Sequence, residues 1–200
     1  MKAKILLITI IFLGFTQVNA QDKKLNFGLK VAPALSWLNS DEKGVSSDGA
    51  VAGFNWGFIG VYNFSQNFAL VSGFNVNSLG GKLKFDATNS SAKINYSELQ
   101  IPLVFQMKSS EIGKIKVYLQ IGLAEGVFLS AKDGDGNSIY SQTIPVNTAW
   151  IVASGVDFPL KGGISLLGQI KYNGGITNVN KSGYNDATSS FVELGIGILF

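Results

Sequence analysis

The most regular feature of the chain is an alternation of bulky apolar residues with polar or small ones. It is clearest near the end, in residues 190–200, where one side of an extended strand would carry Val192, Leu194, Ile196, Ile198 and Phe200. The other side would carry Glu193, Gly195 and Gly197. Successive side chains of a β-strand point to opposite faces, so this stretch predicts a strand with one apolar face.

The same alternation predicts eight strands, each followed by turn-forming residues. Their ranges are 25–38, 51–64, 68–85, 93–108, 115–129, 147–160, 164–176 and 190–200. Three features disturb the pattern. Pro33 indicates a bulge or another irregularity, Gly80-Gly81 obscures the register, and Glu125 falls on an apolar face, which a bulge or a position near a rim would explain.

The connections between these segments are alternately long and short for most of the chain. The long polar ones are residues 39–50, 132–145 and 177–189, while the connection at 86–92 is intermediate. Short turns on one rim and long loops on the other are typical of bacterial outer-membrane barrels, where the short turns are periplasmic. An even number of strands then places both chain ends at the periplasmic rim.

Residues 1–20 read as a secretory signal peptide, with a basic end, a short apolar run and small residues before Gln21. The apolar run is too short for a membrane helix, which needs about 20 residues. Removal of Lys2 and Lys4 leaves 14 basic against 13 acidic residues, so nucleic acid is not an expected partner. Residues 21–200 are expected to form one domain.

Low charge, at 14% of residues, with 24 glycines and 12% aromatics suits a wall that faces lipid. Backbone polar groups in hydrocarbon must all be paired, so strands can cross a membrane only in a closed sheet. We therefore expect an all-β, eight-stranded, antiparallel, up-and-down transmembrane β-barrel in the outer membrane of a Gram-negative cell. An aromatic last residue, Phe200, also resembles the C-terminal assembly signal of such barrels and makes their assembly machinery an expected partner.

An eight-stranded barrel has an interior filled by side chains, and the polar faces supply the filling. The inward set is expected to be Lys30, Glu98, Gln100, Lys116, Gln120, Asp157, Gln169, Lys171, Asn173 and Glu193. Buried charges need partners, so we expect a structural charge network among Glu98, Lys116, Lys171 and Glu193. Aromatic belts at the membrane interfaces are expected to use Trp37, Trp56, Tyr62, Tyr96, Trp150 and Tyr172.

Alternation alone leaves a second architecture open, a soluble periplasmic lipocalin-like barrel with its apolar face inward around a small apolar ligand. The small residues opposite the bulky ones, the nearly uninterrupted apolar faces and the terminal aromatic favour the membrane barrel.

Catalytic chemistry is limited because the chain has no histidine and no cysteine. Triads with a histidine base and histidine or thiolate metal sites are therefore excluded, and no catalytic, cofactor or metal site is predicted. Residues 133–137 resemble the start of a calcium loop, but Ser138 and Ile144 replace the required glycine and glutamate, so a turn is the better interpretation. Three roles remain as hypotheses: binding through the loops at 39–50, 132–145 and 177–189, a structural role in the envelope, and a narrow pore for small solutes.

Four segments together resemble the PorT-like family of outer-membrane β-barrels. They are Y-S-E-L-Q-I-P-L-V-F-Q-M-K at 96–108, V-Y-L-Q-I-G-L at 117–123, G-Q-I-K-Y-N-G-G-I-T-N-V at 168–179 and the terminal G-I-G-I-L-F. The resemblance covers essentially residues 21–200 and implies an eight-stranded barrel similar to OmpX or OmpA. It does not imply one activity, because a shared fold does not fix function.

Overall fold

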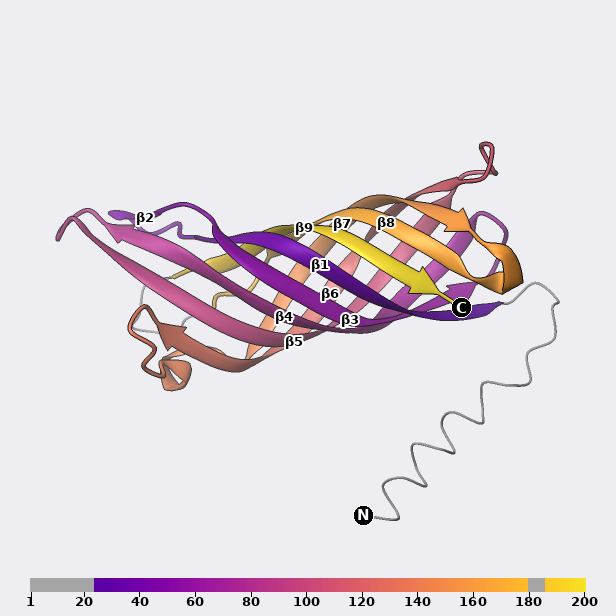
Figure 1. The fold of residues 1–200 in the computed structure, drawn as a ribbon. Coiled ribbons are helices and arrows are strands. Elements are labelled where there is room, and N and C mark those ends of the chain that lie inside the picture. Colours follow the sequence, from indigo (N-terminus) through magenta and orange to yellow (C-terminus); the bar gives the residue numbers. More distant parts are fainter. Residues whose placement is uncertain (1–23, 180–185) are drawn as a thin grey trace, which may run out of the picture.

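The chain forms a closed antiparallel β-barrel in a computed structural model that describes residues 24–179 and 186–200 (Figure 1). Eight strands build the wall: β1 (Leu25–Asn39), β3 (Val51–Asn63), β4 (Phe68–Phe85), β5 (Ser90–Lys108), β6 (Lys116–Asp133), β7 (Val146–Pro159), β8 (Ser165–Gly175) and β9 (Thr188–Leu199). Each pairs with its neighbour in sequence, and β1 pairs with β9 to close the cylinder. The expected eight-stranded barrel is confirmed. The expected signal peptide, residues 1–20, lies outside the described residues.

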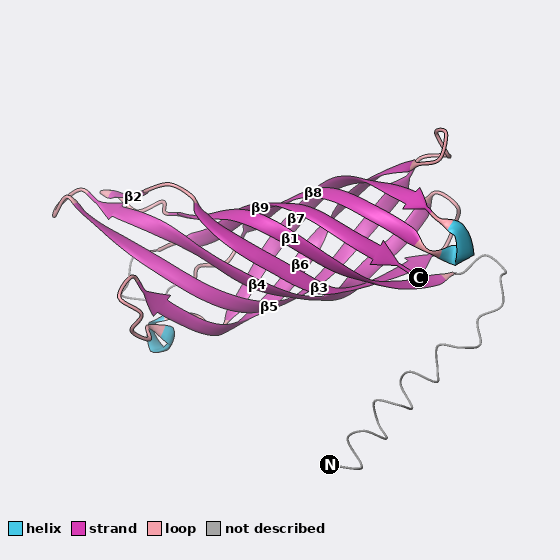
Figure 2. Cartoon of the chain, in the orientation of Figure 1, coloured by secondary structure: helices cyan, strands magenta, loops and turns pink. Residues whose placement is uncertain are grey.

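The two rims of the barrel differ as the connection lengths predicted. The start of β1 and the end of β9 lie at one rim, together with the turns at 64–67, 109–115 and 160–164. The last of these turns contains the short helix η2 (Lys161–Gly163). The opposite rim carries residues 40–50, 86–89, 134–145, 176–179 and 186–187, and the second short helix, η1 (Tyr140–Gln142), lies there (Figure 2). In residues 24–179 and 186–200, no helix has both the length and the hydropathy needed to cross a membrane.

The rim with the long connections, which we call the loop rim, departs from the expected pattern in two places. β4 ends at Phe85 as expected, whereas β5 begins at Ser90 and not at residue 93. The two strands continue beyond the rest of the wall and end in a tight hairpin at residues 86–89, where a loop over 86–92 was expected (Figure 1). Asn89 adopts the left-handed conformation there, which asparagine tolerates better than most residues. A short strand, β2 (Val45–Ser47), pairs with the extended part of β4.

The wall has an apolar outer face and a largely polar middle on its inner face. Leu103 is 58% exposed and Ile196 is 63% exposed, while Glu98 and Glu193 are each only 1% exposed. A soluble barrel would bury the first pair and expose the second. This distribution therefore corresponds to a barrel whose outer surface contacts lipid.

Aromatic side chains gather on the outer face near both rims. Toward the loop rim, the ring of Tyr172 lies 4.9 Å from Trp150 and 6.2 Å from Trp37, measured between centroids. Toward the other rim, Phe64, Phe68 and Phe105 contact one another. Such girdles mark the two membrane interfaces of transmembrane barrels.

The irregularities of the wall agree in part with those expected. The β1–β9 register passes Pro33 without a shift, and the shift in the wall lies between Ser97 and Glu98 in the β5–β6 pairing. A bulge at Pro33 is therefore wrong, but an irregularity there is confirmed, because the β1–β9 pairing omits Ala32 and Pro33. Glu125 keeps its place on the outer face and accepts a hydrogen bond from the Thr148 hydroxyl at 3.0 Å, close to the rim where β7 begins.

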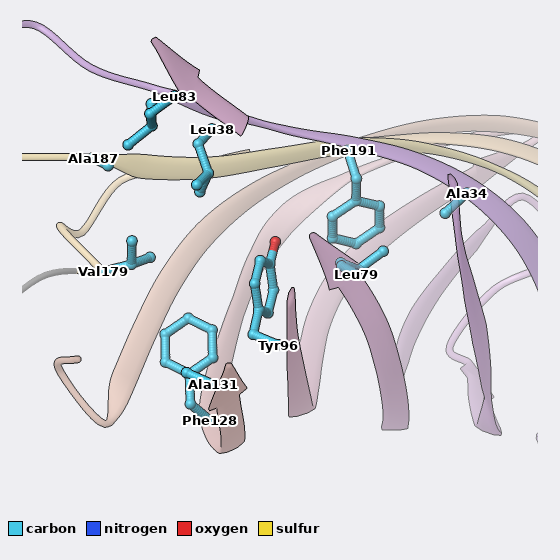
Figure 3. Close-up of a cluster of buried hydrophobic side chains, with 10 residues drawn as sticks. All are labelled: Ala34, Leu38, Leu79, Leu83, Tyr96, Phe128, Ala131, Val179, Ala187 and Phe191. Carbon is cyan, nitrogen blue, oxygen red and sulfur yellow. The ribbon is translucent and has the colours of Figure 1, made fainter. Parts of the chain in front are cut away.

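The interior consists of three layers stacked along the barrel axis. The layer near the loop rim is an apolar cluster drawn in Figure 3: Ala34, Leu38, Leu79, Leu83, Tyr96, Phe128, Ala131, Val179, Ala187 and Phe191. The layer near the other rim is a second apolar cluster: Val61, Ala69, Val71, Val104, Ala124, Ile151 and Leu199. Polar side chains fill the middle.

Tyr96 corrects one sequence-based expectation, because it belongs to the interior and not to an aromatic belt. It is 6% exposed, its ring meets that of Phe128 edge-on at 5.3 Å between centroids, and its hydroxyl contacts that of Ser189. Tyr96 lies two residues before Glu98 on β5, so the alternation of the strand points both side chains inward. This position overrides the preference of tyrosine for membrane interfaces.

Candidate functional site: the lumen charge cluster and the loop cap

The charged centre of the lumen is formed where β1, β9 and β8 lie side by side. Lys30 Nζ lies 2.6 Å from Glu193 Oε1, and Lys171 Nζ lies 3.1 Å from the same oxygen. Asn55 Nδ2 donates to the other carboxylate oxygen, Oε2, at 2.7 Å. A Cβ added at Gly195 would lie 3.3 Å from the Lys30 stem, so a glycine there leaves space for the lysine to cross the lumen.

Glu98 occupies a separate polar position in the same layer. It accepts hydrogen bonds from Asn147 Nδ2 at 2.8 Å and from Asn77 Nδ2 at 3.3 Å. Among the described residues, no lysine nitrogen lies within 4 Å of its carboxylate. Gly126, opposite on β6, has no side chain to compete for the volume that the Glu98 carboxylate fills.

The four residues of the expected network thus fall in three places. Lys171 and Glu193 are in contact, Glu98 is held by amides, and Lys116 lies at the rim that carries the chain ends, 3.6 Å from Glu111. Lys30 joins Glu193 instead. The available signal was barrel closure, because pairing of the first and last strands brings Lys30 beside β9.

A chain of amides continues the polar interior toward the rim with the chain ends. Gln169 donates to Gln120, and Gln120 donates to Gln106, each at 2.7 Å. Next to this chain lies a cavity of about 50 Å³, which Asp157 also borders. Beyond it the lumen opens into a polar depression of about 900 Å³ at that rim.

The loop rim is covered by chain that folds over the apolar cluster. Ile144 N–H donates to the Val179 carbonyl at 2.9 Å, and Val179 N–H donates to the Ala187 carbonyl at 2.8 Å. Val179 and Ala187 are buried, and Ile139 packs against the same cluster. We call residues 134–145 with 176–179 and 186–187 the loop cap.

Residues 133–137 form the turn expected from their sequence. The Asp133 carboxylate accepts hydrogen bonds from the backbone N–H of Asn137 at 2.8 Å and of Asp135 at 3.0 Å, and from Asn137 Nδ2 at 3.1 Å. The side-chain and backbone bonds from Asn137 lower the pKa of Asp133 below its ordinary value. The carboxylate thus caps its own turn, as is usual for aspartate.

Chemically, the lumen cluster pairs buried charges with one another. One carboxylate lies between two ammonium groups and an amide, and these groups are buried between two apolar clusters. Buried charges that are paired in this way hold a structure in one arrangement. The accessible polar surfaces are the loop cap and the depression at the opposite rim.

Comparison with known proteins agrees with this geometry. The chain resembles the crystal structure of Neisserial surface protein A with a TM-score of 0.58 and 18% identity, covering 88% of this chain and 96% of that one. It also resembles the outer membrane protein OprG from Pseudomonas aeruginosa, with a TM-score of 0.52, 12% identity, and coverage of 88% and 95%. A search of curated proteins found no significant match. At these identities the likeness establishes the fold alone.

The sequence also matches, over residues 15–198, the family described as "Outer membrane protein beta-barrel domain". This match covers nearly the whole chain and explains the outward apolar wall and the aromatic girdles. The protein therefore belongs to the outer-membrane β-barrel family and resides in the outer membrane.

Proposed function

We propose that the protein is a non-enzymatic, non-conducting outer-membrane barrel that acts through its loop rim, as a binding surface. One observation carries this proposal: apolar clusters lie in the lumen on both sides of the Lys30–Glu193–Lys171 group, while backbone hydrogen bonds order the loop cap. An interior organised for packing leaves the outer loops as the surface available to partners.

The filled interior speaks against the role of a narrow pore. Barrels of this strand number have lumens just wide enough for side chains, and open aqueous channels need more strands. We expect purified, folded protein in a planar lipid bilayer to give conductance no higher than a protein-free bilayer. Reproducible single-channel steps would overturn this part of the proposal.

Binding through the loop rim is supported by the order of the loop cap and by its exposed residues. Tyr140, in η1, is 39% exposed although its neighbour Ile139 packs inward. A photo-crosslinking amino acid in place of Tyr140, in living cells, should give a discrete adduct with an external partner. The matched site is Ile112, 62% exposed on the opposite rim, where such an adduct should not form.

A purely structural role in the envelope is the competing proposal. It is favoured if crosslinkers at exposed positions of 40–50, 134–145 and 186–187 give no adduct while the barrel is folded. In that case the ordered loop cap serves only to keep water from the apolar cluster beneath it.

Membership of the PorT-like group is part of the proposal, on the strength of where its motif residues lie. In E-L-Q-I-P-L, Glu98 and Gln100 point into the lumen and the three apolar residues Leu99, Ile101 and Leu103 alternate with inward positions. In K-Y-N-G-G-I-T-N, Lys171 belongs to the lumen charge cluster. These motifs support a shared interior and give no guide to a partner.

A further inference from the structure

On three neighbouring strands, the side chains that point outward change from apolar to basic toward the loop rim. On β5 the outward residues run Leu99, Ser97, Asn95 and Lys93. On β4, Lys82 and Lys84 follow the apolar part of the strand, and on β6 Lys132 follows Leu129. Four lysines therefore end columns whose lower parts face lipid.

The strand register gathers these lysines into one patch. Lys82 and Lys93 are direct cross-strand partners, and Lys84 lies two residues beyond Lys82 on the same face. Lys132 pairs with Asn95, which lies two residues from Lys93. Directly opposed residues have Cβ atoms about 4.5–5.5 Å apart and diagonal neighbours about 7–8 Å, so the four ammonium groups share one surface. We call it the lysine patch.

No carboxylate lies within 4 Å of these four ammonium groups in the part of the chain that the structure describes. The ion pairs there are Lys30–Glu193, Lys171–Glu193 and Lys116–Glu111, and none involves the lysine patch. Like charges directly opposite in a sheet are destabilising. A sheet that places Lys82 against Lys93 is therefore suited to an anion from outside the chain.

The position of the patch indicates what that anion is. By strand register, the patch lies beyond the apolar outward residues of β4, β5 and β6, and it faces outward in line with Leu99. Figure 1 shows that β4 and β5 extend beyond the rest of the wall at this rim. In an outer-membrane barrel, whose longer loops are extracellular, an outward surface just beyond the lipid-facing wall lies at the level of the outer-leaflet headgroups. A soluble partner would more readily reach the loop tips.

We propose that the lysine patch binds phosphate groups of an anionic, phosphorylated lipid headgroup in the outer leaflet. Each lysine near an anionic membrane surface raises the affinity for that surface about fivefold. The bound phosphates would offset the repulsion among the lysines. They would also favour one orientation of the barrel about its axis relative to neighbouring molecules in the membrane. This inference does not depend on the proposed loop-rim function.

The test uses the folded full-length barrel in detergent and native mass spectrometry, with diphosphorylated lipid A as the probe. Replacing all four patch lysines by glutamine should weaken binding about tenfold or more. The matched control replaces four lysines of the opposite rim, Lys24, Lys114, Lys116 and Lys161, by glutamine and should change binding less than about twofold. Replacing the patch lysines by arginine should retain binding and shows that substitution there permits folding.

Three results would overturn the proposal. Equal affinity of the patch variant and the unchanged protein would remove the site. Equal loss in the control variant would assign the effect to net charge. If the patch variant lost binding to a soluble polysulfated polysaccharide but still bound lipid A, the patch would face water and a different partner.

Discussion

Glu193 is the residue on which the charge balance of the lumen depends. Its carboxylate is the shared partner of Lys30 and Lys171, and no other carboxylate lies within 4 Å of either lysine in the described chain. Glu98, in the same layer, has neutral amide partners instead. The two glutamates are equally buried, so their difference lies in their partners.

This difference predicts unequal costs for removing the two charges. Glu193→Gln leaves two buried ammonium groups facing each other, and breaking a buried pair in this way costs about 3–5 kcal/mol. Glu98→Gln weakens hydrogen bonds to amides and should cost roughly 1–2 kcal/mol. Urea unfolding of the barrel in lipid vesicles measures both. Equal costs would contradict the assigned pairing.

At the residue scale, the sequence predicted which way most side chains point but not which of them touch. Parity along a strand placed Lys30, Glu98, Lys171 and Glu193 inward, and the structure has them inward. Partners depend on register and on reach across the lumen, which a single sequence does not encode locally. Tyr96 was expected in an aromatic belt because tyrosine favours membrane interfaces, but its position along the strand points it inward.

The strands illustrate which elements can be predicted from sequence. The long strands were recognisable because every second residue faces lipid and is apolar, and because turn-forming residues bound each segment. β2 was missed because three residues inside the polar segment 39–50 carry no period, and their strand geometry comes from pairing with β4. In the β4–β5 extension, the alternation predicted β4 to its end at Phe85 and β5 from residue 93, and residues 90–92 were assigned to a loop because they are small or polar.

The inner apolar cluster near the loop rim predicts a contrast between neighbouring residues of β9. Phe191 is 1% exposed in that cluster, whereas Leu194 is 61% exposed on the outer face. Phe191→Ala should cost about 3–5 kcal/mol through the cavity it leaves. Leu194→Ala, whose side chain exchanges contacts with lipid only, should cost clearly less in the same unfolding assay. The reverse order would mean that the barrel faces are assigned the wrong way round.

The end of the chain predicts an effect on assembly. Phe200 exchanges two backbone hydrogen bonds with Phe27, at 2.8 and 3.1 Å, and its ring is 44% exposed on the outer face. If the assembly machinery reads this aromatic, Phe200→Ala should lower the amount of folded barrel in cells while purified protein still refolds in detergent. Ile198→Ala is the matched change one outward position earlier. Equal losses for both variants would argue against a specific role of the terminal ring.

At the scale of the whole molecule, the account depends on a cylinder with lipid outside and a filled, charge-balanced interior. The outer apolar wall, the two aromatic girdles and the three interior layers are consequences of this single arrangement. The lysine patch extends it to the headgroup region. The role of the loop cap depends on it as well, because a filled lumen leaves the rims as the surfaces for partners.

Site-directed labelling in a lipid bilayer tests this arrangement most directly. The chain has no cysteine, so single-cysteine variants at outward Leu103 and Ile121, and at inward Val104 and Ala124, can each carry one spin label. We predict that labels at 103 and 121 are relaxed strongly by oxygen, which dissolves in lipid, and weakly by a water-soluble nickel complex. Labels at 104 and 124 should be shielded from both. Strong relaxation by the nickel complex at 103 and 121 would contradict the account.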